Sequence, residues 1–296
     1  MKKPFLFLSL LVIPAWGFRS TDINKANKAA ITSCETKILS YTGWKETPKT
    51  KWNLEIKTRN SGQLTYFGAE HSDKPEHSQF KKIKAEFLKT QPTLVFFEGP
   101  NRGIATSETE TIKQFGESGY VRFLANNANV KVQSLEPNPQ DEIRYLMETG
   151  NYSAEQVKLF FVLRETARLR DRKNVTGQAL KTSISQLLQK ANAMFPEFKT
   201  VITDTTELQT AYAKYWTAPQ NWTQAPSAWF DPKGNAEQTG GKFTHDINRL
   251  SSEFRNVHMY RILSEAVQNG EKVFAVVGRN HVPMQAEALK CSLKGL

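Results

Sequence analysis

The sequence predicts an α/β fold in which helices flank a mixed, largely parallel sheet. Short apolar runs at 64–67, 93–97 and 273–277 each end close to a glycine, which is typical of buried strands. Helical spacing of apolar residues follows the first two runs, and the order strand, helix, strand is typical of parallel sheets covered by helices. After the first 17 residues, we expect one domain over 18–296, with a helical insertion between its two sheet-forming halves.

The remaining elements of this fold can be predicted in sequence order. Residues 52–58 alternate apolar and polar side chains, and the turn residues 59–62 join them to the run at 64–67 as a hairpin. Pro92 ends the helix that precedes the run at 93–97. The other predicted segments are helices around 80–88, 120–124 and 141–147, a strand at 130–135, a helix at 244–268 that leads into a strand at 272–277, and a terminal helix at 284–289.

The predicted insertion covers about residues 153–242. Residues 153–198 show two amphipathic helical faces with Gly177 between them, and they either cover the sheet or form a lid over a site. Residues 217–241 combine several prolines and glycines with tryptophans, which predicts a long loop. That loop either lines the mouth of a site or is anchored on the core by its tryptophans.

The N-terminus has the pattern of a secretory signal peptide. A short basic start is followed by an apolar stretch over 4–16 and by the small residues Ala15 and Gly17, so cleavage is expected after Gly17. An uncleaved anchor is the alternative, but the stretch is short for a membrane span of about 20 residues. No cysteine stands at the junction, and no later run is long and apolar enough to span a bilayer. The expected location is therefore periplasmic or secreted, with no stable membrane anchor.

Two cysteines, Cys34 and Cys291, lie near opposite ends of the chain. In an oxidising compartment such an isolated pair is expected to form a disulfide. The alternative is a catalytic thiol, but neither cysteine has a histidine or asparagine as its immediate neighbour.

The chain is basic, with a formal net charge of +11 that falls to about +9 once Lys2 and Lys3 leave with the signal. Arg164, Arg168 and Arg172 recur every four residues and make one face of a helix. This face is either solvated or a patch for an acidic surface. A nucleic-acid partner is not expected, because no nucleic-acid-binding module is recognisable.

Three polar side chains follow predicted strands at their C-terminal ends. His71 and His281 each stand three residues after a glycine, and Glu98 directly follows the run at 93–97. Open α/β sheets bind their ligands at this edge. Two histidines and a carboxylate suffice for a catalytic divalent metal such as zinc, manganese, cobalt or iron, although a histidine at a strand end is equally well explained as a hydrogen-bonded structural residue.

These motifs resemble those of the TraB/PrgY/GumN family, to which the animal TIKI proteases are similar. The resemblance rests on Gly68-x-x-His71, Glu98-Gly99-Pro100, Arg255-Asn256-x-x-Met259 and Gly278-x-x-His281, in that order and in these strand and helix contexts. It covers roughly residues 64–135 and 244–289. A more distant similarity is to erythromycin-esterase-like and haem-binding ChaN-like proteins, which share the fold.

The resemblance implies a metal-dependent hydrolase, with a peptidase as the expected type and a peptide or other acyl compound as substrate. On this mapping His71, Glu98 and His281 are metal ligands or acid–base groups, and Arg255 orients Glu98 or stabilises an oxyanion. The chain departs from the family pattern at three residues, which leaves the substrate and the metal open; they are Ala69, Asn280 and Pro283.

Two other functions are open at this stage. One is a non-catalytic protein that binds a metal, haem or peptide in the same pocket, and the other is a metal-independent, esterase-like hydrolase. Glu70 and Glu136 are secondary site candidates, with surface or capping roles as the alternative. The remaining histidines lack the strand-end context and are expected to be structural or exposed; they are His77, His245 and His258.

Overall fold

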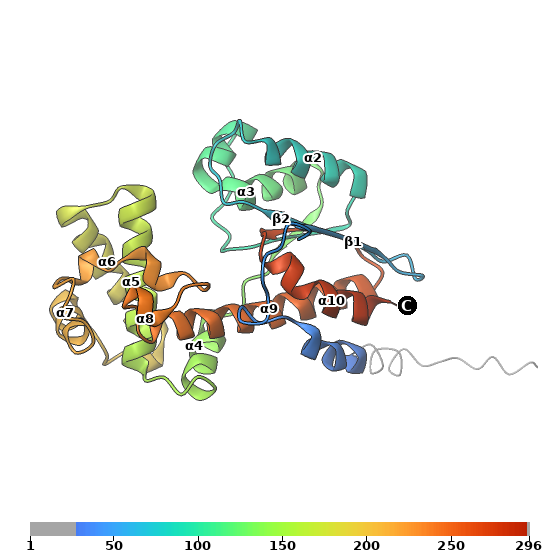
Figure 1. Ribbon diagram of the computed structural model, residues 1–296. Helices are drawn as coiled ribbons and strands as arrows, with labels where there is room; N and C mark the ends of the chain where they lie inside the picture. Colours follow the sequence, from blue (N-terminus) through green and yellow to red (C-terminus); the bar gives the residue numbers. More distant parts are fainter. Residues whose placement is uncertain (1–27, 295–296) are drawn as a thin grey trace, which may run out of the picture.

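A computed structural model describes residues 28–294 (Figure 1). A helical segment at 28–34 comes first. The elements that follow are η1 (Glu35–Lys37), β1 (Asn53–Lys57), β2 (Gln63–Ala69), α2 (Ser78–Thr90), β3 (Leu94–Phe97), α3 (Glu108–Asn127), β4 (Lys131–Ser134), α4 (Pro139–Glu148), α5 (Ala154–Lys173), α6 (Gly177–Met194), η2 (Pro196–Phe198), α7 (Thr205–Ala213), η3 (Trp222–Gln224), η4 (Ser227–Phe230), α8 (Ala236–Thr239), α9 (Thr244–Gln268), β5 (Lys272–Gly278) and α10 (His281–Leu293).

The strands form one mixed sheet in the order β1-β2-β5-β3-β4. The pairs β2–β5, β5–β3 and β3–β4 are parallel, and only the hairpin pair β1–β2 is antiparallel. The predicted α/β class with a mixed, largely parallel sheet is therefore confirmed. The last strand, β5, is inserted between β2 and β3, so the C-terminal ends of the three central strands meet at one edge.

Helices cover both faces of this sheet (Figure 1). Alternate residues of one strand point to opposite layers: Phe96 packs in the core beneath α9 and α10, and Val95 and Phe97 pack in the core beneath α2 and α3. The period of two along a strand explains this division. Because both layers are apolar, the central strands read as continuous apolar runs in the sequence.

The predicted insertion is a helical region with an aromatic core of its own. In Figure 1 it forms the part of the molecule that contains α5 to α8. Trp216 stacks on Trp229 with 4.8 Å between ring centroids, and Tyr212 stacks on Trp216 at 5.3 Å. Trp222 is also buried in this core. The tryptophans of the long loop thus anchor it, while Pro232 and Lys233 of the same loop reach a cavity at the sheet edge.

Helix α9 joins the two parts, since one end packs against α5 and η4 and the other against β2, β5 and α10. Its predicted range of 244–268 is confirmed. Cys34 and Cys291 are bonded, with their Cα atoms 5.8 Å apart, which ties the first helical segment to α10 as predicted.

The predicted signal peptide, residues 1–17, lies outside the described residues. Within 28–294, the helices are each too short or too polar to span a bilayer.

Candidate functional site

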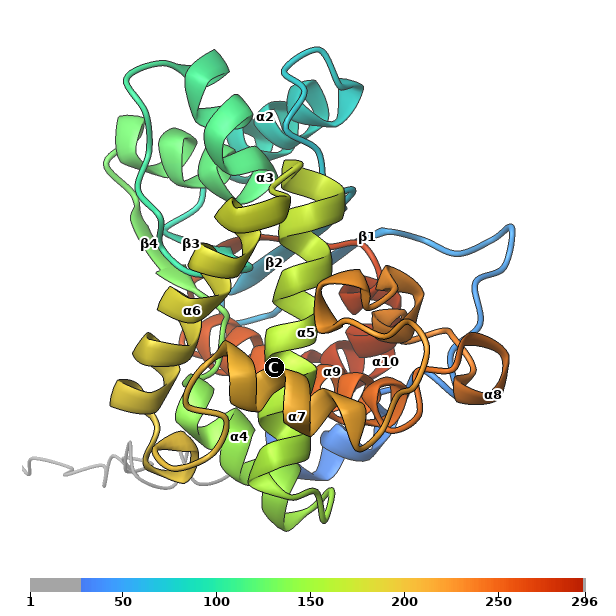
Figure 2. The same ribbon diagram turned by 90° about the vertical axis from the view of Figure 1, so that its left-hand side faces the viewer.

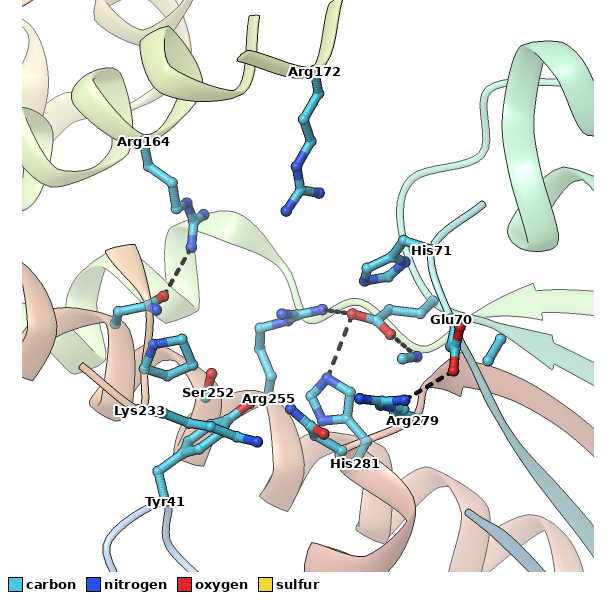
Figure 3. A pocket seen from close by; sticks show the side chains of 16 residues that line it. Tyr41, Glu70, His71, Arg164, Arg172, Lys233, Ser252, Arg255, Arg279 and His281 are labelled. Atoms are coloured by element: carbon cyan, nitrogen blue, oxygen red, sulfur yellow. Dashed lines mark hydrogen bonds and ion pairs between the residues drawn. The ribbon is translucent and has the colours of Figure 1, made fainter. Parts of the chain in front are cut away.

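The three predicted strand-end residues meet at one cavity of about 580 Å³ (Figure 3). His71 lies two residues beyond β2, Glu98 directly follows β3, and His281 begins α10 after β5. The parallel pairing of these strands places their C-terminal ends side by side. Arg255 enters the same cavity from the middle of α9.

The ring of His71 is held by a carboxylate. Its Nδ1 lies 2.6 Å from Glu117 Oε1, and a backbone N–H one residue further on, at Ser72, also donates to Glu117. This hydrogen bond with Glu117 raises the pKa of His71 above its usual value of 6.5. The carboxylate fixes the ring and increases the basicity of the other nitrogen, Nε2, which lies on the side of Glu98 and Gly278.

Glu98 is nearly buried, with 16% of its side chain exposed, and it is charged. Arg255 Nη2 donates to Oε1 at 2.6 Å, the backbone N–H of Gly278 donates to Oε2, and His281 Nε2 lies 3.4 Å from Oε1. Burial alone would raise the pKa of this carboxyl, but the charges of His281 and Arg255 outweigh it and hold the pKa well below 4.5. A carboxylate with so low a pKa is a weak base and a strong electrostatic partner.

Arg255 bridges two carboxylates. Besides Glu98, it donates through Nε and Nη2 to Glu136, which in turn accepts from the backbone N–H of Gly99. Burial opposes the charge of the guanidinium, but the two carboxylates more than offset it and raise the pKa of Arg255. Within residues 28–294, the hydrogen bonds of Arg255 to these two carboxylates use Nε and Nη2, so the N–H groups of Nη1 can donate to another partner.

The orientation of His281 follows from Asn256, one residue after Arg255. Asn256 Oδ1 accepts from Gln285 Nε2 at 2.8 Å, and as a carbonyl oxygen it has no proton to donate. His281 Nδ1, 2.7 Å from the same oxygen, must therefore be a donor. The other nitrogen, Nε2, faces Glu98, and a proton on it makes that contact attractive, whereas a lone pair would face a second acceptor. The ring of His281 is therefore held between the amide oxygen of Asn256 and the carboxylate of Glu98.

Close contacts explain the glycines of the two motifs. Neither Gly68 nor Gly278 has a positive φ, so neither is required by a sharp turn. A Cβ at Gly68 would lie 2.5 Å from the carbonyl oxygen of Trp52. A Cβ at Gly278 would lie 3.1 Å from Glu98 Oε2 and 3.5 Å from His71 Nε2. The close approach of other groups requires these glycines.

The secondary candidates divide into two cases. Glu136 belongs to the buried network through Arg255. Glu70 lines the cavity but is an exposed residue that pairs with Arg279 at 2.9 Å. The other histidines lie outside the cavity lining: His77 caps α2, His245 is buried against the loop before α9, and His258 is half-buried on α9.

Several residues at the site were not predicted from the sequence. Glu117 is 46 residues from its histidine, so no spacing rule connects them. Asn256 was part of the helix motif but had no assigned role. Arg164 and Arg172 were expected on a solvated or acid-binding face, and both line the cavity, whereas Arg168 pairs with its neighbour Glu165.

The donor set does not form a metal site in this arrangement. Among residues 28–294, no group of three or more His, Cys, Asp or Glu side chains is placed to hold a metal ion. Arg255 donates to the same Glu98 oxygen that faces His281, and this cation would repel a metal there. The metal-dependent mechanism therefore stays a prediction.

No family model, curated protein or solved structure matches this chain. The resemblance to the TraB/PrgY/GumN family accordingly stays a prediction.

Proposed function

We propose that this protein is a hydrolase of acyl compounds, either esters or peptides. The observation that supports it best is the convergence of two oriented histidines on an ionised glutamate at one cavity. His71 is held by Glu117, His281 is held by Asn256, and both rings present Nε2 on the side of Glu98. Two imidazoles held in fixed orientations at one cavity are suited to general base and general acid chemistry.

His71 is the base in this proposal. More than half of its side chain, 61%, is exposed to the cavity, so Nε2 can contact a water molecule there. The neighbouring carboxylate of Glu117 stabilises the imidazolium that forms when the water loses its proton. The hydroxide then attacks the carbonyl carbon of the substrate.

Arg255 and His281 act on the charges that develop next. The oxygen of the attacked carbonyl becomes negative, and a fixed cationic donor such as Arg255 Nη1 stabilises it. His281, protonated on Nε2, donates a proton to the leaving oxygen or nitrogen. Glu98 faces His281 Nε2 at 3.4 Å and holds Arg255 in place; its low pKa makes it a positioning residue and a poor base.

The test is hydrolysis of a panel of ester and peptide substrates by the wild-type protein and two variants. His71→Ala is expected to lower kcat by about 10²-fold or more, the usual size of an acid–base contribution. Glu98→Gln is expected to lower kcat to a similar extent, because it removes the charge that positions His281 and Arg255. The matched control is His77→Asn, which removes a histidine outside the cavity lining and keeps a residue that caps α2. Full activity of both site variants would refute the mechanism.

The predicted dependence on a divalent metal has a separate test. Metal content is measured after loading with zinc, manganese, cobalt or iron, for the wild type and for the His71→Ala/His281→Ala double variant. Near-stoichiometric metal that the double variant loses would support the metal-dependent form of the proposal. Turnover by protein from which chelators have removed all metal would support the metal-independent form.

A further inference from the structure

The cavity at the site is strongly cationic. Its lining includes five cations and only two carboxylates; the cations are Arg164, Arg172, Lys233, Arg255 and Arg279. Both carboxylates, Glu70 and Glu98, already have arginine partners. Lys233 likewise has a carboxylate partner, Glu46, at 3.3 Å. The excess positive charge therefore comes from the two arginines of α5, Arg164 and Arg172.

Arg164 is a desolvated cation without an anionic partner. It forms no ion pair with a carboxylate in the described part of the chain, and its hydrogen bond is to the amide oxygen of Asn248 at 3.5 Å. The guanidinium stacks on the rings of Phe160 and Phe161, 4.7 and 5.2 Å from their centroids. Burial lowers its pKa, although an arginine stays charged at neutral pH. Arg164 is partly buried, and the charges of Glu142, Glu136 and Glu165 offset part of its desolvation without forming an ion pair with it. The desolvation that remains costs free energy, which a bound anion would offset.

The position of Arg164 is also set in advance. The amide group of Asn248 is oriented by its own hydrogen bond to the carbonyl oxygen of Phe230, 2.7 Å away. The rings of Phe160 and Phe161 also contact the guanidinium and restrict its movement. Such a group loses little conformational freedom when a ligand binds.

Arg172 lies two turns further along α5 and points into the same space. Figure 3 shows both side chains extending from α5 toward the part of the cavity that carries His71 and Arg255. Arg172 forms no ion pair between residues 28 and 294, and its charge is close enough to His71 to oppose protonation of that ring. Arg168, between the two on the helix, instead pairs with Glu165 at 2.6 Å.

We propose that Arg164 and Arg172 bind an anionic group of the substrate, a carboxylate or a phosphate, on the wall of the cavity opposite His71. That the bound anion belongs to a substrate rests on the proposed hydrolase function, whereas the charge and position of the two arginines support the anion site independently of it. Guanidinium groups bind both anions through paired, charge-assisted hydrogen bonds. A cavity of about 580 Å³ has room for a small molecule or the end of a peptide in addition to this group.

The test is calorimetric titration of the purified protein at low ionic strength with inorganic phosphate and, separately, with acetate. Saturable binding at one site is expected, and each of Arg164→Gln and Arg172→Gln is expected to weaken it about tenfold, the usual effect of one charge-assisted hydrogen bond. Arg168→Gln is the matched control, since it removes the same charge from the same helix outside the cavity. The preferred anion distinguishes a phosphate-bearing from a carboxylate-bearing ligand. Absence of binding, or equal loss in Arg168→Gln, would overturn the proposal.

A thermal melt separates a binding role of Arg164 from a purely structural one. If the guanidinium is there for a ligand, Arg164→Gln leaves the Tm unchanged or raises it, because a buried charge has been removed. A clear fall in Tm together with unchanged anion binding would assign Arg164 to packing and overturn its part in the site. Arg172 is exposed, so its variant tests binding without a risk to folding.

The two proposals fail in different ways. In one outcome, hydrolysis depends on His71, but the Arg164→Gln/Arg172→Gln double variant cleaves both neutral and anionic substrates at the wild-type rate. This outcome would refute the anion site and leave the hydrolase proposal standing. If no substrate is cleaved but anion binding is lost in the double variant, the anion site stands as a binding site and the hydrolase proposal is refuted.

Discussion

At the scale of single residues, the site depends on pairs that set the state of each acid–base group. Glu117 makes His71 more basic, whereas His281 and Arg255 make Glu98 less basic. When the surroundings raise the pKa of one group and lower that of its neighbour, the first group is suited to act as a base and the second as an electrostatic partner. Such separation is typical of catalytic sites, although structural ion pairs produce it too.

A first prediction concerns the pH profile. A neutral His71 is needed to accept a proton, so kcat/KM is expected to rise with pH through the pKa of His71, which the hydrogen bond to Glu117 raises. Glu117→Gln removes the negative charge, so the rising limb should move to lower pH while the maximal rate falls. Rates of ester hydrolysis between pH 5 and 9 would measure this. If the rising limb of the pH–rate profile lies at the same pH in Glu117→Gln as in the wild type, His71 is excluded as the titrating base.

At the scale of elements, α9 holds the site together. It supplies Arg255 to two strand-end carboxylates and Asn256 to His281 of α10. Because α9 also packs against α5 and η4, it joins the catalytic groups to the wall that carries the arginines. The motif Arg255-Asn256-x-x-Met259 thus has one physical explanation: two consecutive residues contact groups that follow three neighbouring strands, and Met259 lies in the core beneath the sheet.

The second prediction concerns this helix. Arg255→Met leaves the carboxylates of Glu98 and Glu136 without their cationic partner. Removing one partner of a buried ion pair lowers the free energy of unfolding by about 3–5 kcal/mol, because the other charge stays buried and unpaired. In the wild type the depressed pKa of Glu98 contributes stability above about pH 4.5, its usual value, and this contribution is lost as the pH falls further. The deficit of Arg255→Met should therefore shrink in acid. Denaturant unfolding at pH 7 and at pH 3.5 would show it.

Arg261→Met is the control for this prediction. Arg261 lies on the same helix and pairs with Glu35 at 2.6 Å, but 58% of its side chain is exposed. Exposed pairs contribute about 0–1 kcal/mol, so its loss should be small. Equal losses in both variants would mean that the Arg255 network contributes no more than a surface pair does.

At the scale of the whole molecule, the cavity lies where the sheet edge meets the helical region. In Figure 2, α5 passes in front of the strands, and residues of both parts line the cavity. The helical region therefore does more than cover the sheet: α5 supplies two of the five cations, and the long loop supplies Lys233.

The third prediction concerns the disulfide, which links residues 257 positions apart. In the chain-entropy model a loop of this length stabilises the folded state by up to about 5 kcal/mol. Cys34→Ser/Cys291→Ser is expected to lower the free energy of unfolding by an amount of this order, because the unfolded chain gains freedom. Urea denaturation of the oxidised wild type and the double variant measures the difference.

Neither cysteine lines the cavity, so anion binding by the folded double variant should match that of the wild type. An unchanged free energy of unfolding in the variant would indicate that the unfolded chain is restricted by other means.

The sequence by itself determined the α/β class, the order of the main elements, the pairing of the two cysteines and the three strand-end side chains. These follow from short-range patterns: apolar runs for strands, helical spacing for helices, and polar residues placed directly after a strand. His71, Glu98 and His281 could be predicted to meet because parallel strands end at the same edge.

Only the tertiary structure decided which groups complete the site. Glu117 reaches His71 across 46 residues, and Arg172 reaches the cavity because α9 and the long loop hold α5 beside the sheet edge. The surroundings of Gly278 also appear only in three dimensions, since a Cβ there would lie 3.1 Å from Glu98 Oε2, closer than an ordinary contact. Contacts between distant segments depend on how layers pack, and no local pattern in the sequence records that packing.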